Sequence, residues 1–218
     1  MIKTLYPPFR RWTEKGTLWV YSDPHFSDPD MVKLRTNYIG DEEQIARINS
    51  KVGKHDTIIF LGDIGNEEMV RKIRGYKVLI MGNHDKGASN YADIFDEVYE
   101  GPLFIAEKLI LSHEPVDLPF AFNIHGHEHN YIWREHHLNV CAERIDYLPM
   151  NMNKMLKNGL LSEVGSIHRM TIDRAVERKQ KKECHDFKRE LDTILVNKIC
   201  TDDEIQEFIS QWRKEIYE

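Results

Sequence analysis

Short apolar runs separated by polar loops mark the first half of the chain. Residues 18–21, 57–61 and 77–80 are rich in Val, Ile, Leu and aromatic side chains, and each run ends in a polar or glycine-containing loop. Runs of this length and composition are typical of buried strands. We therefore expect three strands here, each followed by a loop.

Two stretches between these runs have a helical pattern. Residues 41–52 open with three acidic side chains, which suit the first turn of a helix, and then place apolar residues at helical spacing. Residues 67–74 are expected to form a shorter helix that is closed by Gly75. The alternation of strand, loop and helix predicts a parallel sheet of the α/β class.

The pattern changes after residue 97. The apolar runs at 97–99, 103–105 and 109–111 are short and closely linked, which favours hairpins. Residues 122–124 and 138–141 are expected to be further strands. The second half of the sheet structure should therefore differ in topology from the first.

From about residue 150 the chain is highly charged and its pattern is helical. A capping box at 201–204 precedes one apolar stripe, and a second stripe lies at 187–199. The pair predicts an αα-hairpin whose stripes pack against the chain itself or form a homodimer. The basic run 178–182 has acidic flanks, which favours a solvated helix face over a contact with phosphate backbones.

Composition narrows the classes of function. The chain has 218 residues, of which 41% are hydrophobic and 30% charged, and its formal net charge is -6. This balance speaks against a general nucleic-acid or membrane binder, although bound divalent cations would reverse the local charge at a carboxylate site. Three cysteines without Cys-x-x-Cys spacing, and a start without an apolar signal segment, favour reduced thiols and a cytoplasmic location.

Polar side chains that can bind metals or transfer protons follow the predicted strands. They are Asp23 and His25 after the first strand, Asp63 after the second, Asn83, His84 and Asp85 after the third, and then His113, His127 and His129. Parallel strands place their carboxyl ends at one edge of a sheet, so the first three of these loops can converge.

These side chains suffice for two divalent metal ions. Such a pair needs about seven protein ligands and one anion shared by both ions. Asp63 has two carboxylate oxygens and can bridge, and Gly62 before it lets the backbone pass close to the ions. Mixed oxygen and nitrogen ligands favour Mn, Fe, Zn or Ni over Ca or Mg.

Taken in order, Asp-x-His, Gly-Asp, Gly-Asn-His-Asp, a lone His after a strand, and Gly-His-x-His resemble the calcineurin-like metallophosphoesterase superfamily. The resemblance covers residues 17 to 157 and is greatest to small bacterial, archaeal and phage phosphoesterases without a large cap. It implies an α/β fold in which a two-layer β-sandwich is flanked by helices. The catalytic domain would span residues 1–157, and a C-terminal helical extension would span 158–218.

The resemblance also implies a role for each residue. Asp23, His25 and His129 would bind one metal ion, Asn83, His113 and His127 would bind the other, and Asp63 would bridge them. His84 would donate a proton to the leaving oxygen or stabilise charge on it, and Asp85 would orient His84. A hydroxide shared by the two ions would attack phosphorus in line. The expected cofactors are two divalent ions, manganese first, with iron, zinc or nickel as alternatives.

The resulting prediction is a hydrolase that acts on a small phosphodiester, with nucleotides among the candidate substrates. A phosphomonoesterase acting on a nucleotide or a phosphoprotein stays open, because a two-metal site with one His acid serves both reactions. A non-catalytic scaffold of the same fold is the alternative from another class, and the intact ligand set disfavours it. The sequence departs from the family pattern at Asn66, where many members carry an acid, and at 26–28, which lacks a Gly-His pair.

Overall fold

The computed structural model describes residues 11–165, apart from 13, 15, 36 and 107, together with positions 206 and 210. The chain divides into two compact units, Met1–Ser166 and Ile167–Glu218. The predicted αα-hairpin and the basic run 178–182 therefore lie outside the described residues, apart from those two isolated positions.

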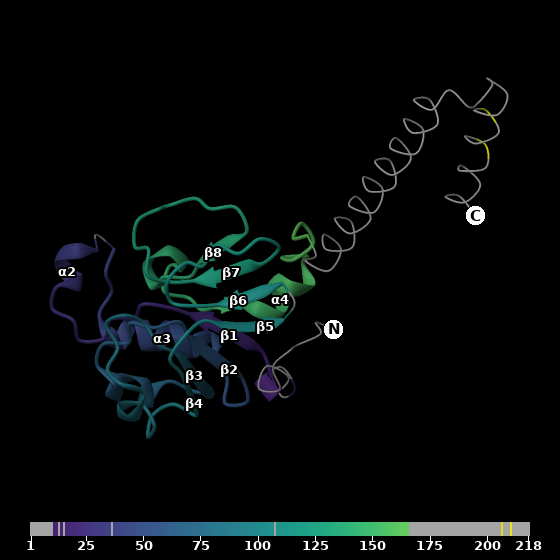
Figure 1. Cartoon of the computed structure of the whole chain (residues 1–218). Coiled ribbons are helices and arrows are strands. Elements are labelled where there is room, and N and C mark those ends of the chain that lie inside the picture. Colours follow the sequence, from purple (N-terminus) through teal and green to yellow (C-terminus); the bar gives the residue numbers. More distant parts are fainter. Residues whose placement is uncertain are drawn as a thin grey trace. The chain divides into compact units, whose positions relative to one another are not determined.

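The first unit contains a five-stranded sheet in the order β4-β3-β2-β1-β9 (Figure 1). The strands are β1 (Leu18–Tyr21), β2 (Thr57–Phe60), β3 (Tyr76–Ile80), β4 (Glu97–Tyr99) and β9 (Met150–Asn151). β1 to β4 are parallel to one another, and β9 is antiparallel to β1. The parallel sheet predicted from the three apolar runs is confirmed.

A second sheet has four strands in the order β5-β6-β7-β8. The strands are β5 (Leu103–Ala106), β6 (Leu109–Leu111), β7 (Phe122–His125) and β8 (His137–Asn139). β5 and β6 form the expected antiparallel hairpin, whereas β6, β7 and β8 are parallel. The described unit is thus a mixed α/β structure with two sheets and few helices.

The expectation of hairpins from residue 97 onward is wrong for β4. This strand joins the first sheet in parallel, with Val78 opposite Glu97 and Ile80 opposite Tyr99. The link between β3 and β4, residues 81–96, is long enough to return the chain to the same end of the sheet, which a parallel pair requires. A three-residue apolar run does not reveal which neighbour it will pair with.

Both faces of the first sheet are buried. Along β2 and the residue after it, Ile58 and Phe60 pack into one hydrophobic cluster while Ile59 and Leu61 pack into another. All four side chains are inaccessible to solvent. Successive side chains of a strand point to opposite faces, so burial on both sides accounts for the continuous apolar run in the sequence.

One cluster contains side chains from both sheets. It combines Ile59 and Val78 of the first sheet with Leu109 and Ile124 of the second. The two sheets therefore share a hydrophobic core, which holds the loops at the ends of β1, β2 and β3 near those at the ends of β6 and β7.

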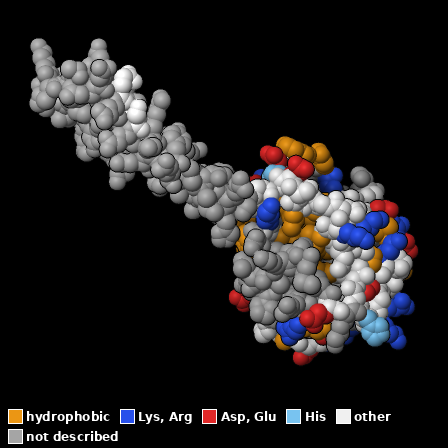
Figure 2. Space-filling view, turned by 90° about the vertical axis from the view of Figure 1, so that its right-hand side faces the viewer, with side chains coloured by type: hydrophobic (Ala, Val, Ile, Leu, Met, Phe, Trp, Pro, Cys, Tyr) orange, Lys and Arg blue, Asp and Glu red, His pale blue; other side chains and the backbone are white. Residues whose placement is uncertain are grey.

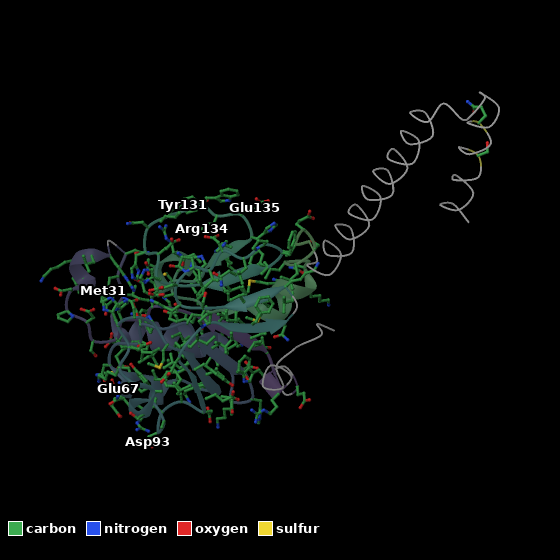
Figure 3. All side chains as sticks on the ribbon, viewed as in Figure 1. Met31, Glu67, Asp93, Tyr131, Arg134 and Glu135 are labelled. Atoms are coloured by element: carbon green, nitrogen blue, oxygen red, sulfur yellow. The ribbon has the colours of Figure 1, made fainter. Side chains whose placement is uncertain are left out.

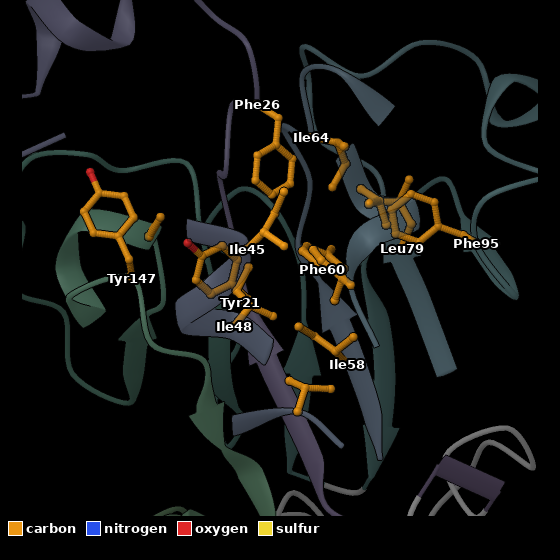
Figure 4. Close-up of a cluster of buried hydrophobic side chains, with 14 of the residues drawn as sticks. Tyr21, Phe26, Ile45, Ile48, Ile58, Phe60, Ile64, Leu79, Phe95 and Tyr147 are labelled. Atoms are coloured by element: carbon orange, nitrogen blue, oxygen red, sulfur yellow. The ribbon is translucent and has the colours of Figure 1, made fainter. Parts of the chain in front are cut away.

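The other cluster covers the opposite face of the first sheet (Figure 4). Ile45 and Ile48 of α3 (Asp41–Lys51) lie there with Tyr21 and Phe60, whose rings meet edge to face with centroids 6.0 Å apart. The helix predicted over residues 41–52 is confirmed, and its apolar stripe packs on the sheet.

The remaining described helices are short. They are α2 (Met31–Leu34), α4 (Met152–Lys157) and the 3-10 helices η1 (Glu67–Lys72), η2 (Ala88–Asn90) and η3 (Ala142–Ile145). Asn66 caps η1 by accepting a hydrogen bond from the backbone N–H of Glu68, so the residue that departs from the family pattern has a structural partner. No helix of the described chain is long and apolar enough to cross a membrane.

Figure 2 shows one face of the molecule, on which the described Lys and Arg side chains are interspersed with Asp and Glu. Interspersed charges of opposite sign largely cancel at a distance. That part of the surface therefore has little long-range attraction for a polyanion.

Candidate metal centre

Backbone hydrogen bonds join the loop after β1 to the loop after β2. The N–H of Asp23 donates to Gly62 O at 3.1 Å, and the N–H of His25 donates to Asp63 O at 3.1 Å. The two loops continue side by side as Phe26 N–H donates to Ile64 O at 2.9 Å. Asp23, His25 and Asp63 are therefore held close together by their own backbones.

Four of the predicted ligands have left-handed backbone conformations. The φ angles are 54° at Asp23, 46° at His25, 53° at Asp63 and 65° at His127. Residues other than glycine occupy this region rarely, and such positions are concentrated at functional sites. The fold thus imposes an unfavourable backbone at these residues, which turns their side chains toward a common region.

Asp23, His25 and His129 form the first group of candidate ligands. Asp23 Oδ1 lies 3.9 Å from His25 Nε2 and 3.7 Å from His129 Nε2. Asp23 Oδ1 and His25 Nε2 are buried, and neither has a hydrogen-bond partner in the described structure. Buried polar atoms are almost always satisfied, so two such atoms facing one another fit a shared cation.

Asn83, His113 and His127 form the second group. His113 Nε2 lies 2.8 Å from Asn83 Oδ1 and 3.1 Å from His127 Nδ1, and those two atoms are 3.2 Å apart. The other nitrogen, His113 Nδ1, lies 2.8 Å from Leu61 O and must carry the proton, because a carbonyl only accepts. Nε2 of the ring then faces Asn83 Oδ1 and His127 Nδ1, so the three atoms could ligate one shared cation.

Asp63 lies between the two groups. Its Oδ2 is 3.5 Å from His25 Nε2, and its Oδ1 is 3.5 Å from His113 Nε2. The side chain is 2% exposed. One carboxylate therefore presents a different oxygen to each group.

The spacing of these atoms fits metal coordination. Two ligand atoms about 2.1 Å from one ion and roughly 90–110° apart are about 3.0–3.4 Å from each other. The separations within the two groups run from 2.8 to 3.9 Å. Candidate ligand atoms of Asp23, His25 and His129, and likewise of Asp23, Asp63 and His113, lie within 4.8 Å of one another and could hold metal ions.

Charge also favours a bound cation. Asp23 and Asp63 are both buried, and their nearest candidate ligand atoms are within 4.8 Å of each other. Burying two carboxylates together is costly unless positive charge or protons compensate. Divalent ions would supply that charge at the point where the carboxylate oxygens converge.

The surroundings shift the pKa values of His25 and His129 in opposite directions. Burial lowers the pKa of His25, which keeps its imidazole neutral and able to ligate. The hydrogen bond to the Glu143 carboxylate raises the pKa of His129 against the effect of burial. That bond joins His129 Nδ1 to Glu143 Oε1 at 2.7 Å, so Nε2 of the ring is directed toward Asp23.

Four residues around the ligands are not predicted by the sequence analysis. Asp23 Oδ2 accepts hydrogen bonds from Ser22 Oγ at 2.5 Å and from Cys141 Sγ at 3.3 Å, which leaves Oδ1 for the centre. Burial raises the pKa of the Cys141 thiol, so it remains a donor. Arg35 pairs with Glu143 at 3.4 Å, and both side chains are at most 9% exposed.

The sequence contains little that would identify these supporting residues. Ser22 is adjacent to a ligand, which is a weak signal. Arg35, Cys141 and Glu143 lie outside every motif, and only the tertiary fold brings them to the ligands.

Gly126, before the histidine pair, has a steric reason to be glycine. A Cβ at this position would collide with Ser22 Oγ and Asp23 Oδ2. Gly126 therefore lets the loop after β7 reach Asp23, and the N–H of the next residue, His127, donates to Asp23 Oδ2 at 3.0 Å.

His84 lies at the rim of the centre. It is exposed, its ring centroid is 6.0 Å from that of His25, and its backbone N–H donates to Asp63 Oδ1 at 3.0 Å. His125 is the last residue of β7, and its Nδ1 lies 2.8 Å from Gly126 O.

Asp85 was expected to orient the His84 ring, but its carboxylate bonds to other groups. Its two carboxylate oxygens accept hydrogen bonds from the backbone N–H groups of Asp63, Ile64 and Gly82 at 2.7–3.0 Å. The Tyr91 hydroxyl donates a further bond at 3.1 Å. Asp85 thus ties the loop after β3 to the loop after β2, and the physical reason is that turns expose N–H groups that a carboxylate satisfies.

No protein-family model matches the sequence, and no curated protein matches it. Among solved structures, the chain is similar to a protein of unknown function from Aquifex aeolicus, with a TM-score of 0.56 and 24% identity over 65% of this chain and 98% of that one. It is also similar to nuclease MPE from Pseudomonas putida, with a TM-score of 0.40 and 24% identity over 58% of this chain and 66% of that one. The likeness to the Aquifex protein is one of fold.

The hydrogen bonds of Asp85 predict that the Asp85→Ala variant is destabilised even without metal. Removing the carboxylate leaves three backbone donors without their acceptor, at about 1–3 kcal/mol each when buried. Urea unfolding followed by circular dichroism should show a loss of about 3 kcal/mol or more, whereas the control Asp93→Ala, an exposed residue nearby, should change little. Equal stability of the two variants would contradict this role for Asp85.

Proposed function

We propose that the protein is a hydrolase of phosphoric esters that uses two divalent metal ions. The observation that carries the proposal is the position of Asp63, whose two oxygens each lie 3.5 Å from a histidine of a different ligand group. A carboxylate shared in this way suits a pair of ions rather than a single one. The order of the five motifs along the chain adds the resemblance to calcineurin-like metallophosphoesterases.

The candidate ligands would be shared between the two ions. Asp23, His25 and His129 would hold one ion, Asn83, His113 and His127 would hold the other, and Asp63 would touch both. When bound, two such ions lower the pKa of water and neutralise charge on the phosphoryl oxygens. The buried Asp23 and Asp63 carboxylates would fix the ions in place, and the Glu143 hydrogen bond would keep His129 oriented.

His84 would act on the leaving group. It is exposed at the rim and adjacent to the ligand Asn83, and its backbone is fixed to Asp63. An imidazole in this position can donate a proton to the departing oxygen. The ring is free of a ligand role in the proposed scheme, so this function and metal binding can be separated by mutation.

A phosphodiester is the substrate we favour, on the resemblance to small members of the superfamily without a cap. A phosphomonoesterase would use the same ligands and the same acid. Manganese is the first candidate for the metal, and the mixed oxygen and nitrogen ligands equally admit iron, zinc or nickel.

The proposal predicts metal-dependent turnover of a chromogenic diester. Added Mn, Ni or Zn should start hydrolysis, because the ions supply the charge stabilisation that the reaction needs. Bis(4-nitrophenyl) phosphate should be hydrolysed faster than 4-nitrophenyl phosphate, because a phosphodiester is the substrate we favour. Turnover should cease after removal of metal by a chelator and return on its addition. Bound metal by elemental analysis without turnover of either ester would favour the scaffold alternative.

The Asp63→Asn variant should lose at least one of the two metal ions. The amide has the shape of the carboxylate, but it is neutral and offers one oxygen in place of two. Elemental analysis of the purified protein should show the loss, with Asp93→Asn, at an exposed position, as the matched control. An unchanged metal content in Asp63→Asn would remove the bridging role.

The His84→Ala variant should keep its metal and lose most of its turnover. General-acid catalysis contributes about 100-fold to 10,000-fold, and the loss should be largest for a diester with an alkyl leaving group, which needs a proton more than 4-nitrophenolate does. His55→Ala, at another exposed histidine, is the matched control. Equal losses for both leaving groups would show that His84 does not protonate the departing oxygen.

A further inference from the structure

A run of large apolar side chains is exposed in the loop between β7 and β8. Tyr131 is 77% exposed, Ile132 52% and Trp133 71%. Single exposed apolar residues are common, but three in succession, two of them aromatic, are typical of a binding surface. We call Tyr131 and Trp133 the aromatic platform.

Ion pairs and a side-chain-to-backbone bond anchor the loop that carries the aromatic platform. Arg134 pairs with Glu128 at 2.8 Å and with Asp117 at 3.2 Å. The Asn139 side chain donates to Glu128 O at 2.5 Å. These contacts fix both ends of the platform segment, which reduces the entropy that a ligand would have to remove on binding.

The aromatic platform is next to the candidate metal centre along the chain and in space. Tyr131 is two residues from the candidate ligand His129. The Arg144 guanidinium lies 5.8 Å from the centroid of the Tyr131 ring, and the residue before Arg144, Glu143, accepts the hydrogen bond from His129. Figure 3 shows Tyr131 and Arg134 along the same outer edge of the molecule.

Charge at the platform suits an anionic ligand. Of the acids near the platform, Glu128 and Asp117 pair with Arg134, Glu143 pairs with Arg35, and Glu135 lies 3.6 Å from His136. The exposed Arg144 guanidinium lies over one face of the Tyr131 ring, where it adds a positive charge that can attract a phosphate. A ligand that carries a flat aromatic group and a phosphate would match both features.

We infer that the aromatic platform binds the base of a nucleoside-bearing phosphodiester whose phosphorus lies at the metal centre. This inference rests on the proposed function and specifies the substrate class for it. Bases stack on exposed aromatic side chains whatever their sequence, and each stacked base contributes about 1–3 kcal/mol. The platform consists of two side chains, so it suits a nucleotide or a short oligonucleotide rather than a long duplex.

Two diesters with the same leaving group test the inference. The 4-nitrophenyl ester of thymidine 5′-monophosphate carries a base, and methyl 4-nitrophenyl phosphate does not. The ratio of kcat/KM for the first to kcat/KM for the second should fall about tenfold in Tyr131→Ala and in Trp133→Ala. Trp133→Phe should keep most of the ratio, and Leu118→Ala, which removes another exposed apolar side chain, should keep all of it.

The remaining outcomes distinguish failure of the platform from failure of the proposed function. An unchanged ratio would overturn the platform, whether both esters lose activity in parallel or neither does. If a dimer also dissociates in the two Ala variants, the exposed side chains form a contact between copies instead. If wild-type protein with Mn turns over neither ester, the proposed function fails. Equilibrium dialysis of thymidine 5′-monophosphate then tests the platform: weaker binding to Tyr131→Ala and Trp133→Ala than to Leu118→Ala supports it, and equal binding overturns it.

Discussion

The candidate centre depends on one electrostatic constraint, the burial of Asp23 and Asp63 at the same point. A fold can keep two carboxylates away from water only if something positive reaches them. The surrounding groups meet this need in part. Ser22, Cys141 and the His127 N–H satisfy Oδ2 of Asp23, which leaves its Oδ1 available to a cation. Both oxygens of Asp63 face histidine nitrogens, and Oδ1 also accepts from the N–H of His84.

The two sheets turn this constraint into a site. The parallel strands β1, β2 and β3 end at one edge of the first sheet. The shared hydrophobic core brings the loops after β6 and β7 to the same region. The Asp85 carboxylate then joins the loop after β3 to the loop after β2 through three backbone N–H groups. Position along the chain matters less here than the layered packing, because the second group of ligands comes from both sheets.

Local patterns in the sequence predicted several strands, one helix and the convergence of the first ligands, but not strand pairing or the supporting contacts. The apolar runs predicted β1, β2, β3 and α3, and strand polarity predicted that Asp23, His25, Asp63 and Asn83 would converge. Pairing partners of short strands such as β4 depend on the length of the link and on tertiary packing, neither of which a three-residue run encodes. The sequence did not predict the roles of Arg35 and Glu143 or the loop-supporting bonds of Asp85 for the same reason. Their partners are distant in the chain or belong to the backbone.

β9 has a consequence for how the protein is made. β1 lies between β2 and β9, so one side of the strand that leads into Asp23 stays an open edge until Met150 and Asn151 pair with it. All seven candidate ligands are synthesised before that strand, at positions 23 to 129. A growing chain therefore carries every ligand while the sheet beneath them is still incomplete, and an unpaired strand edge is a template for association with other chains. Once β9 pairs with β1, that edge of β1 is covered.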